Sequence, residues 1–213
     1  MRHFYGSELE LNVTWVDDTS SVRVGHSFLN FELEQEVTGT YHVAFNVPGS
    51  RFEEARAWLE TRAPLLHDAH GHTSFVFDSW QSQAVYVLDP DGNLIELIGR
   101  RALDPITRGA FGASHLLGIS EVGVVVDDVP AVVQGAERHL GVTPYLGQRH
   151  PEFTAVGDET GLLIVVKTGR PWFPTLEPAL SPPVHVSFDQ ASVGLLVHGG
   201  SAQWRTEHAE GSS

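Results

Sequence analysis

The pattern of apolar and polar positions divides most of the chain into short β-rich runs and two amphipathic helices. From residue 41 onward it predicts a strand at 41–47, a helix at 51–61, and strands at 72–78, 84–88 and 93–98. Ser50, followed three residues later by Glu53, forms a capping box that predicts where the first helix begins. The turn at Asp89-Pro90-Asp91-Gly92 joins the last two strands. The unit therefore has the order βαβββ.

A second, shorter copy of this pattern follows. It contains a strand at 121–126, a helix that is capped by Asp127 or Asp128 and ends at Gly141, and strands at 143–146, 153–156 and 162–167. Residues 1–40 resemble a further copy without its first strand, with the end of a helix and strands at 13–16, 21–24 and 28–33. The chain therefore contains an internal repeat.

The repeat predicts a modular organisation. The expected units are a first module at 1–40 that lacks its first strand, a second βαβββ module at 41–102, a linker at 103–118, a third module at 119–170, a Pro-rich connector with a late strand at 171–190, and a C-terminal tail at 191–213. The late strand, at 184–188, has a pattern similar to that of 42–45, so we hypothesise that it fills the missing edge of the first module. The alternative is an ordinary edge strand or a dimer contact. The polar segment from Ser201 onward is expected to fray.

Two polar residues interrupt the apolar strands of the second unit. His42 begins one strand and Glu96 lies inside another. Burying an unpaired carboxylate costs several kcal/mol, so Glu96 needs a cation, hydrogen bonds or a wet cavity. A metal ion shared with His42 would supply the cation. Considered alone, His42 is better interpreted as a core histidine that a backbone carbonyl satisfies, and Glu96 in the same unit shifts the interpretation to a pair that faces a cavity.

Composition narrows the classes of function. The chain is 41% hydrophobic, enough for a sizeable core, and its net charge is −14, with 13 basic and 27 acidic residues. This charge argues against nucleic acid and anionic membranes as partners. The sequence has no cysteine, so any metal site must use N and O ligands. It shows neither a signal-peptide run nor a membrane-spanning run, and a cytoplasmic protein is expected.

Several of these segments resemble one known group of proteins. The tandem βαβββ units, the run Tyr41-His42-Val43-Ala44-Phe45, the stretch 84–88 and the turn and strand at 89–97 are similar to the vicinal oxygen chelate superfamily. This superfamily contains glyoxalases, bleomycin and fosfomycin resistance proteins, and extradiol dioxygenases. The resemblance implies an α+β fold in which βαβββ modules pair into an open mixed-sheet barrel, with a third, shorter module behind.

The resemblance also assigns candidate ligands. In the superfamily, the first and last strands of each module point ligands into one cavity, and here these positions fall on His42 and Glu96 in the second module. The last-strand position of the first module falls on Asn30, with Glu32 on the same face of the strand. The first-strand position of that module is missing.

Three residues remain open as the third ligand. His185 would serve if the late strand fills the gap, Glu121 if the second and third modules pair, and Glu32 if its strand faces inward. We rank His185 ahead of Glu32, so the expected metal set is His42, Glu96 and His185. Two histidines and a carboxylate suit Fe(II) or Mn(II), and Ni and Zn are also candidates.

The pocket around this site is expected to include Asn30, Trp80 and Tyr86, since ligand sites are mainly apolar with few polar groups. The histidine-rich stretch at 67–72 is interpreted as a solvated loop, with His72 alone at the cavity mouth.

The resemblance implies a divalent-metal-dependent enzyme of the glyoxalase or dioxygenase type, acting on a small substrate chelated through two adjacent oxygens. The reaction would be that of a lyase, an isomerase or a ring-cleaving dioxygenase, with Glu96 or Glu32 transferring a proton. The alternative is a metal-free binding protein of the bleomycin-resistance kind, and a third possibility is a purely structural or regulatory dimer. The expected partners are a small-molecule substrate and a second copy of the chain.

Overall fold

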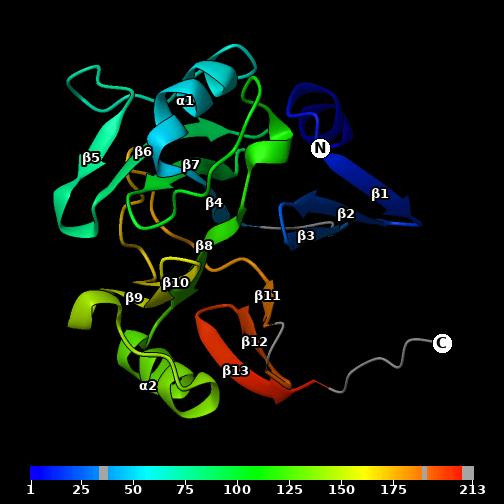
Figure 1. Cartoon of the computed structure of the whole chain (residues 1–213). Helices are drawn as coiled ribbons and strands as arrows, with labels where there is room; N and C mark the ends of the chain where they lie inside the picture. Colours follow the sequence, from blue (N-terminus) through cyan, green and yellow to red (C-terminus); the bar gives the residue numbers. More distant parts are fainter. Residues whose placement is uncertain (34–37, 189–190, 208–213) are drawn as a thin grey trace.

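A seven-stranded mixed sheet forms the centre of the computed structural model, which describes residues 1–33, 38–188 and 191–207 (Figure 1). The strand order is β5-β6-β7-β4-β8-β10-β9. One module supplies β4 (His42–Pro48), α1 (Phe52–Glu60), β5 (Phe75–Phe77), β6 (Ser82–Leu88) and β7 (Leu94–Arg100). The next supplies β8 (Gly118–Val126), α2 (Val129–Leu140), β9 (Phe153–Asp158) and β10 (Gly161–Lys167). The predicted α+β class, with modules paired into a curled mixed sheet that forms a half-barrel, is confirmed.

The two modules meet where their first strands pair. Within each module the first and last strands are parallel, β4 with β7 and β8 with β10, while β4 and β8 pair antiparallel across the junction. The register places Ala44 opposite Glu121, and it shifts between Ala44 and Phe45. The pairing of the second module with the third is the arrangement in which Glu121 was a candidate ligand.

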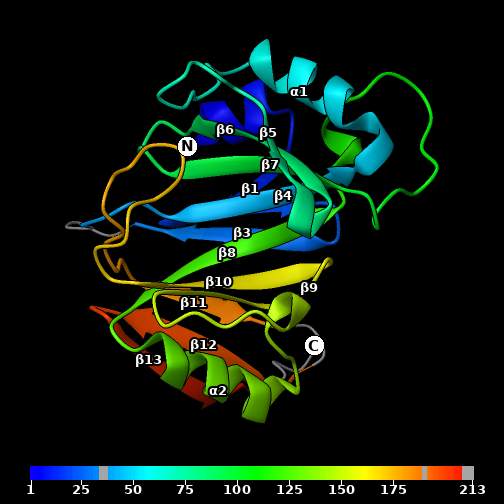
Figure 2. The same ribbon diagram turned by 90° about the vertical axis from the view of Figure 1, so that its left-hand side faces the viewer.

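The two faces of the large sheet have different roles. Figure 2 shows β6, β7, β4, β8 and β10 following one another between α1 at the top and α2 at the bottom. Alternate residues of β4, Val43, Phe45 and Val47, point away from the concave face and join the core that contains Trp58 and Leu59 of α1. Fully burying each side chain of this size contributes about 1.5–3 kcal/mol. The concave face is left for the side chains of the site.

The helix ends follow the sequence prediction only in part. Asp128 caps α2 by accepting a hydrogen bond from the Ala131 N–H at 3.0 Å, as predicted. Ser50 does not cap α1: its N–H and Oγ donate to Asp104 Oδ1 at 2.9 and 2.6 Å, because the following connector brings a carboxylate to it. Among the described residues, none of the helices has the length and apolarity needed to cross a bilayer.

One strand predicted in the third module is absent from the described sheet. Residues 145–147 form a 3-10 turn, in which Leu146 has a φ of 54°. A strand requires negative φ, and a left-handed residue followed by Gly147, at φ 69°, turns the chain instead. The third module therefore contributes one strand fewer to the sheet than the second.

The N-terminal residues form a separate antiparallel sheet. A π-helix at His3–Glu8 precedes β1 (Asn12–Val16), β2 (Thr19–Val24) and β3 (Ser27–Glu32), which pair in chain order. Phe4, Tyr5 and Val22 are buried in the core that also contains Phe45 and Leu59. This unit therefore covers the outer side of the second module.

The late strand does not fill the edge of the first module, so that hypothesis was wrong. β11 (Val184–Ser187) pairs with β12 (Val193–His198), which pairs with β13 (Ser201–Thr206). The partner strand follows close by in the chain, and Leu195 and Val197 are buried against the α2 side of the third module. Residues 201–206, which were expected to fray, are therefore a strand, and residues 208–213 lie outside the described part of the chain.

Gly135 on α2 allows this third sheet to approach the helix. A Cβ at Gly135 would lie 2.1 Å from Trp204 Nε1. Gly135→Val is therefore expected to lower the free energy of unfolding by about 1–3 kcal/mol, as overpacking does. Urea unfolding would measure this, with Gly161→Val as the matched control because a Cβ there meets nothing within 4 Å. Equal effects at both positions would contradict the close contact.

Candidate metal centre

Three acid-base side chains from three neighbouring strands gather on the concave face. Ala44 on β4 pairs with Glu96 on β7 and with Glu121 on β8, so both carboxylates share its face, and His42 lies two residues earlier. His42 Nε2 and Glu96 Oε2 are 2.9 Å apart. One possible ligand atom from each of His42, Glu96 and Glu121 lies within 4.8 Å of the other two, and all three residues are buried. The structure thus brings the predicted pair together and adds Glu121.

Arg100, at the end of β7, is a fourth charged residue in this buried region. It is only 1% exposed, and its Nη2 donates to Glu121 Oε1. Its Nε and Nη2 also lie 3.3 Å from Ser120 Oγ, and its guanidinium lies over the Trp80 ring, 5.6 Å from the centroid. Arg100 was not predicted as part of the site, because nothing in the local sequence distinguishes it from a surface arginine that ends a strand.

Burial decides the protonation of Glu121. It raises the pKa of this carboxyl from its ordinary value of 4.5 to about 7, and the negative charge of Glu96 adds to the increase. The opposing effects of Arg100 and His42 are smaller. Glu121 is therefore poised to gain or lose a proton near neutral pH.

His42 and Tyr86 respond to the same carboxylates. Burial lowers the pKa of His42, but the hydrogen bond and charge of Glu96 outweigh it, with a further contribution from Glu121, and the net change is upward. Burial raises the pKa of Tyr86 well above its ordinary value, and the charges of Glu96 and Glu121 and a hydrogen bond to Glu96 act in the same direction. Tyr86 therefore keeps its proton.

The donor set fits a divalent cation. His42 Nδ1 is buried with no hydrogen-bond partner among the described residues, which is unusual for a polar atom in a core. Glu121 has Arg100 as its ion-pair partner, whereas Glu96 has only the imidazole of His42 among the described residues. One imidazole nitrogen and two carboxylate oxygens suit Fe, Mn, Ni or Zn. The three residues could therefore hold one such ion.

A cavity of about 290 Å³ opens over this cluster. Its charged and acid-base lining consists of His42, Glu96, Glu121 and Arg170. The rest of the lining is mainly aromatic and includes the predicted Trp80 and Tyr86, with Phe77, Ile98, Phe153, Ile164, Trp172 and Phe173. A mainly apolar cavity with a few convergent polar groups is typical of a small-molecule site.

The connector that follows β10 closes one side of the cavity. The Trp172 ring lies 5.2 Å from the His42 ring, between centroids, and Phe173 packs edge-on against Phe75 at 4.7 Å. Gly123 leaves room for this contact, since a Cβ there would lie 2.9 Å from Trp172 Cη2 and 3.0 Å from His42 Cβ.

The other predicted ligands lie elsewhere. His185, on β11, pairs with Glu207 Oε1 at 2.7 Å, and about half of its side chain is exposed. Glu32 and Asn30 lie on the exposed face of β3, in the N-terminal sheet. The geometry thus corrects the ranking of these candidates: the modules that pair are the second and third, and this pairing brings in Glu121.

His72 is also separate from the cavity lining. It lies in the connection before β5, 68% of its side chain is exposed, and its Nδ1 lies 3.0 Å from Asp68 Oδ2. Asp68 also accepts hydrogen bonds from the backbone N–H groups of His70 and His72. The histidine-rich stretch is therefore a loop organised around Asp68, as its interpretation as a solvated loop implied.

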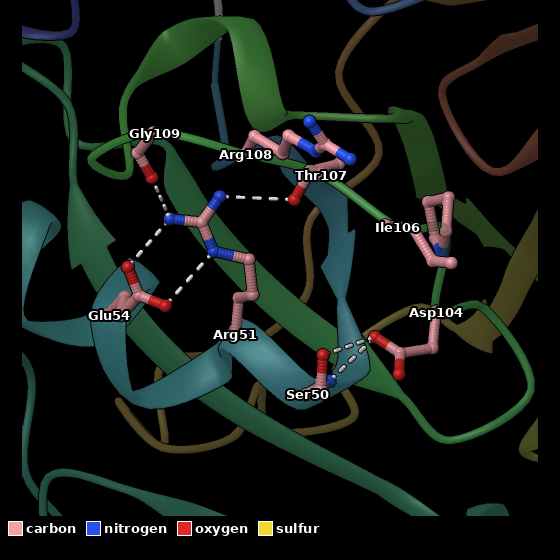
Figure 3. Close-up of a pocket in the computed structure, with 9 residues that line it drawn as sticks. Ser50, Arg51, Glu54, Asp104, Ile106, Thr107, Arg108 and Gly109 are labelled. Atoms are coloured by element: carbon pink, nitrogen blue, oxygen red, sulfur yellow. Dashed lines mark hydrogen bonds and ion pairs between the residues drawn. The ribbon is translucent and has the colours of Figure 1, made fainter.

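A second, more open hollow lies between the start of α1 and the connector at 104–109 (Figure 3). Its volume is about 470 Å³. Arg51 donates to both carboxylate oxygens of Glu54, at 3.0 and 2.6 Å, to Thr107 Oγ1 at 3.0 Å and to the Gly109 carbonyl at 2.8 Å. These polar groups hold the connector against the helix, so we interpret the hollow as structural.

Comparison with known proteins identifies the fold. No protein-family model matches the sequence, and no curated protein matches it. Among solved structures, a Bacillus subtilis protein described as a "putative dioxygenase" matches 98% of this chain and 81% of its own, with 14% identity and a TM-score of 0.55. Glyoxalase I from Zea mays matches 78% of this chain and 60% of its own, with 15% identity and a TM-score of 0.45. The chain therefore shares its fold with the Bacillus subtilis protein.

Proposed function

We propose that the protein is a divalent-metal-dependent enzyme that acts on a small substrate bound through two adjacent oxygens. The observation that carries this proposal is the convergence of His42, Glu96 and Glu121, whose ligand atoms lie within 4.8 Å of one another beneath a mainly aromatic cavity. The fold, shared with a protein described as a dioxygenase, agrees with a reaction of the glyoxalase or dioxygenase type.

The residues of the site would have separate roles. His42, Glu96 and Glu121 would hold the ion, which supplies Lewis-acid chemistry to the substrate oxygens when bound. Arg100 orients Glu121, as a hydrogen-bond partner of a ligating carboxylate does. The pKa of about 7 of Glu121 belongs to the metal-free protein, and a bound ion would favour its ionised, ligating form. The aromatic walls exclude water from the reacting atoms.

One observation favours a second candidate, a metal-free binding protein. Arg100 already places a positive charge against Glu121, so the buried cluster has one cation without an ion. In this alternative the four side chains form a hydrogen-bonded floor, and the aromatic cavity of about 290 Å³ binds the ligand. The two candidates differ in whether the protein takes up metal.

Metal titration tests the proposal. Protein purified without chelator is expected to bind one divalent ion per chain, and His42→Ala and Glu96→Gln are each expected to weaken the affinity at least about tenfold, because each removes a ligand. Calorimetry with Fe, Mn, Ni and Zn would measure this.

The chain offers a matched control for these variants. His185 and Glu207 form another His–Glu pair, at 2.7 Å, on a different sheet. His185→Ala and Glu207→Gln should leave metal binding unchanged. Uptake below about a tenth of an equivalent at saturating metal would reject the enzyme proposal and favour the metal-free protein, since a preformed three-ligand site should fill.

A further inference from the structure

Arg170 is a cation on the cavity wall that no carboxylate neutralises among the described residues. It lies in the connector after β10, and its guanidinium lies over the Phe153 ring, 4.7 Å from the centroid. Its one side-chain hydrogen bond within the described part of the chain is a long one, from Nη1 to the Pro171 carbonyl at 3.4 Å. Arg100, by contrast, has Glu121 as its partner.

The negative charge around Arg170 makes its unpaired guanidinium a candidate binding site for an anionic group. The chain has 13 basic residues against 27 acidic ones, and the cavity floor already holds two carboxylates. Arg170 is therefore a local positive site within a negative surround. A guanidinium presents a planar fork that matches a carboxylate through two parallel hydrogen bonds, and stacking on Phe153 limits its freedom before any ligand arrives.

The rest of the cavity lining indicates the shape and chemistry of the uncharged part of the ligand. Aromatic side chains, among them Trp80, Phe153 and Trp172, line the space, and its volume of about 290 Å³ lies at the small end for ligand pockets. Flat aromatic walls in so small a space favour a molecule with a single planar ring. A doubly charged group such as phosphate would add a second negative charge close to Glu96 and Glu121, so a carboxylate is the better match.

We propose that the substrate is a single-ring compound that carries a carboxylate as well as the two adjacent oxygens, and that Arg170 binds this carboxylate at the cavity wall. The assignment of the adjacent oxygens rests on the proposed function, whereas the carboxylate contact rests on Arg170 alone. Arg170 would then decide which ring compounds the protein accepts, without being a ligand of the metal.

A pair of probes isolates the carboxylate. 3,4-Dihydroxybenzoate and its methyl ester share the ring and the adjacent hydroxyls and differ in the charge. Calorimetry on the wild-type protein is expected to show about tenfold tighter binding of the acid, the scale of one charge-assisted contact. Arg170→Gln should bring the ratio of the two dissociation constants close to one, and Arg170→Lys should keep part of it. Arg138→Gln, on the exposed side of α2, should leave it unchanged.

The titration is run with and without metal so that the two proposals fail separately. If the acid preference and its loss in Arg170→Gln persist in protein that binds no metal, the carboxylate site stands and the metal-dependent function fails. If metal binds but the wild-type protein takes acid and ester equally, or takes neither, the carboxylate site is overturned. An acid preference that survives in Arg170→Gln also overturns it.

Discussion

Replacing Arg100 with Met is expected to lower the free energy of unfolding by about 3–5 kcal/mol, because it leaves Glu121 buried without its guanidinium partner. Arg100 is 1% exposed and Glu121 is 4% exposed, so water cannot take the place of the lost contact. Methionine keeps most of the apolar volume against Trp80, so the loss reports the charge rather than a void. Urea unfolding at pH 8, where Glu121 is ionised, would measure the difference.

Two further variants separate the ion pair from general damage. The double variant Arg100→Met with Glu121→Gln removes both charges and should recover most of the lost stability, since an unpaired buried charge is what costs free energy. Arg138→Met, on the exposed surface of α2, should change the stability by less than about 0.5 kcal/mol. If Arg100→Met were as mild as Arg138→Met, the buried pair would contribute nothing measurable.

Raising the pH from 5 to 8 is expected to destabilise the metal-free protein by about 3 kcal/mol through Glu121. In the unfolded chain this carboxyl loses its proton near its ordinary pKa of 4.5, whereas in the folded protein it keeps the proton to about 7. Between these values the folded state binds more protons, so its stability falls as the pH rises and the fall is complete above 7. The raised pKa of His42 acts in the same direction above its ordinary value of 6.5.

Denaturant unfolding at a series of pH values in the presence of chelator would measure this slope. Asp68, whose pKa is lowered to about 2, and Asp104, whose pKa is also lowered, lose their favourable contacts only at more acid pH, so they do not mask the effect between pH 5 and 8. The variant with Arg100→Met and Glu121→Gln should show a much flatter profile. Stability that rises with pH over this window in the wild-type protein would contradict the assignment.

Much of the fold could be predicted because local pattern determines it. Alternation and turn residues located the strands of the second module, and the family resemblance then assigned His42 and Glu96 to ligand positions on its first and last strands, which pair in the structure. The third ligand depended on which strands pair across modules. Apolar runs at both 121–126 and 184–188 suit that role, and periodicity does not choose between partners distant in the chain, so His185 was ranked first.

The roles of Arg100, Arg170 and the connector after β10 could not be predicted from the sequence for a related reason. Arg100 is buried only because β8 brings Glu121 beside the end of β7, and Arg170 reaches the cavity only because the connector folds back over the concave face. Neither position carries a local signal, since an arginine after an apolar strand is ordinary. The contact of Trp172 with His42 depends in addition on Gly123 in a different strand.

The candidate metal centre lies where β4 pairs with β8, so both modules contribute residues to it. His42 and Glu96 come from one module and Glu121 from the other, so neither half has the complete set of ligands by itself. An ion that binds all three side chains would stabilise the pairing of β4 with β8, and this stabilisation would increase with the affinity for the ion. Any substitution that weakens the pairing of β4 with β8, even far from the ligands, would then first lower the affinity of the protein for the metal.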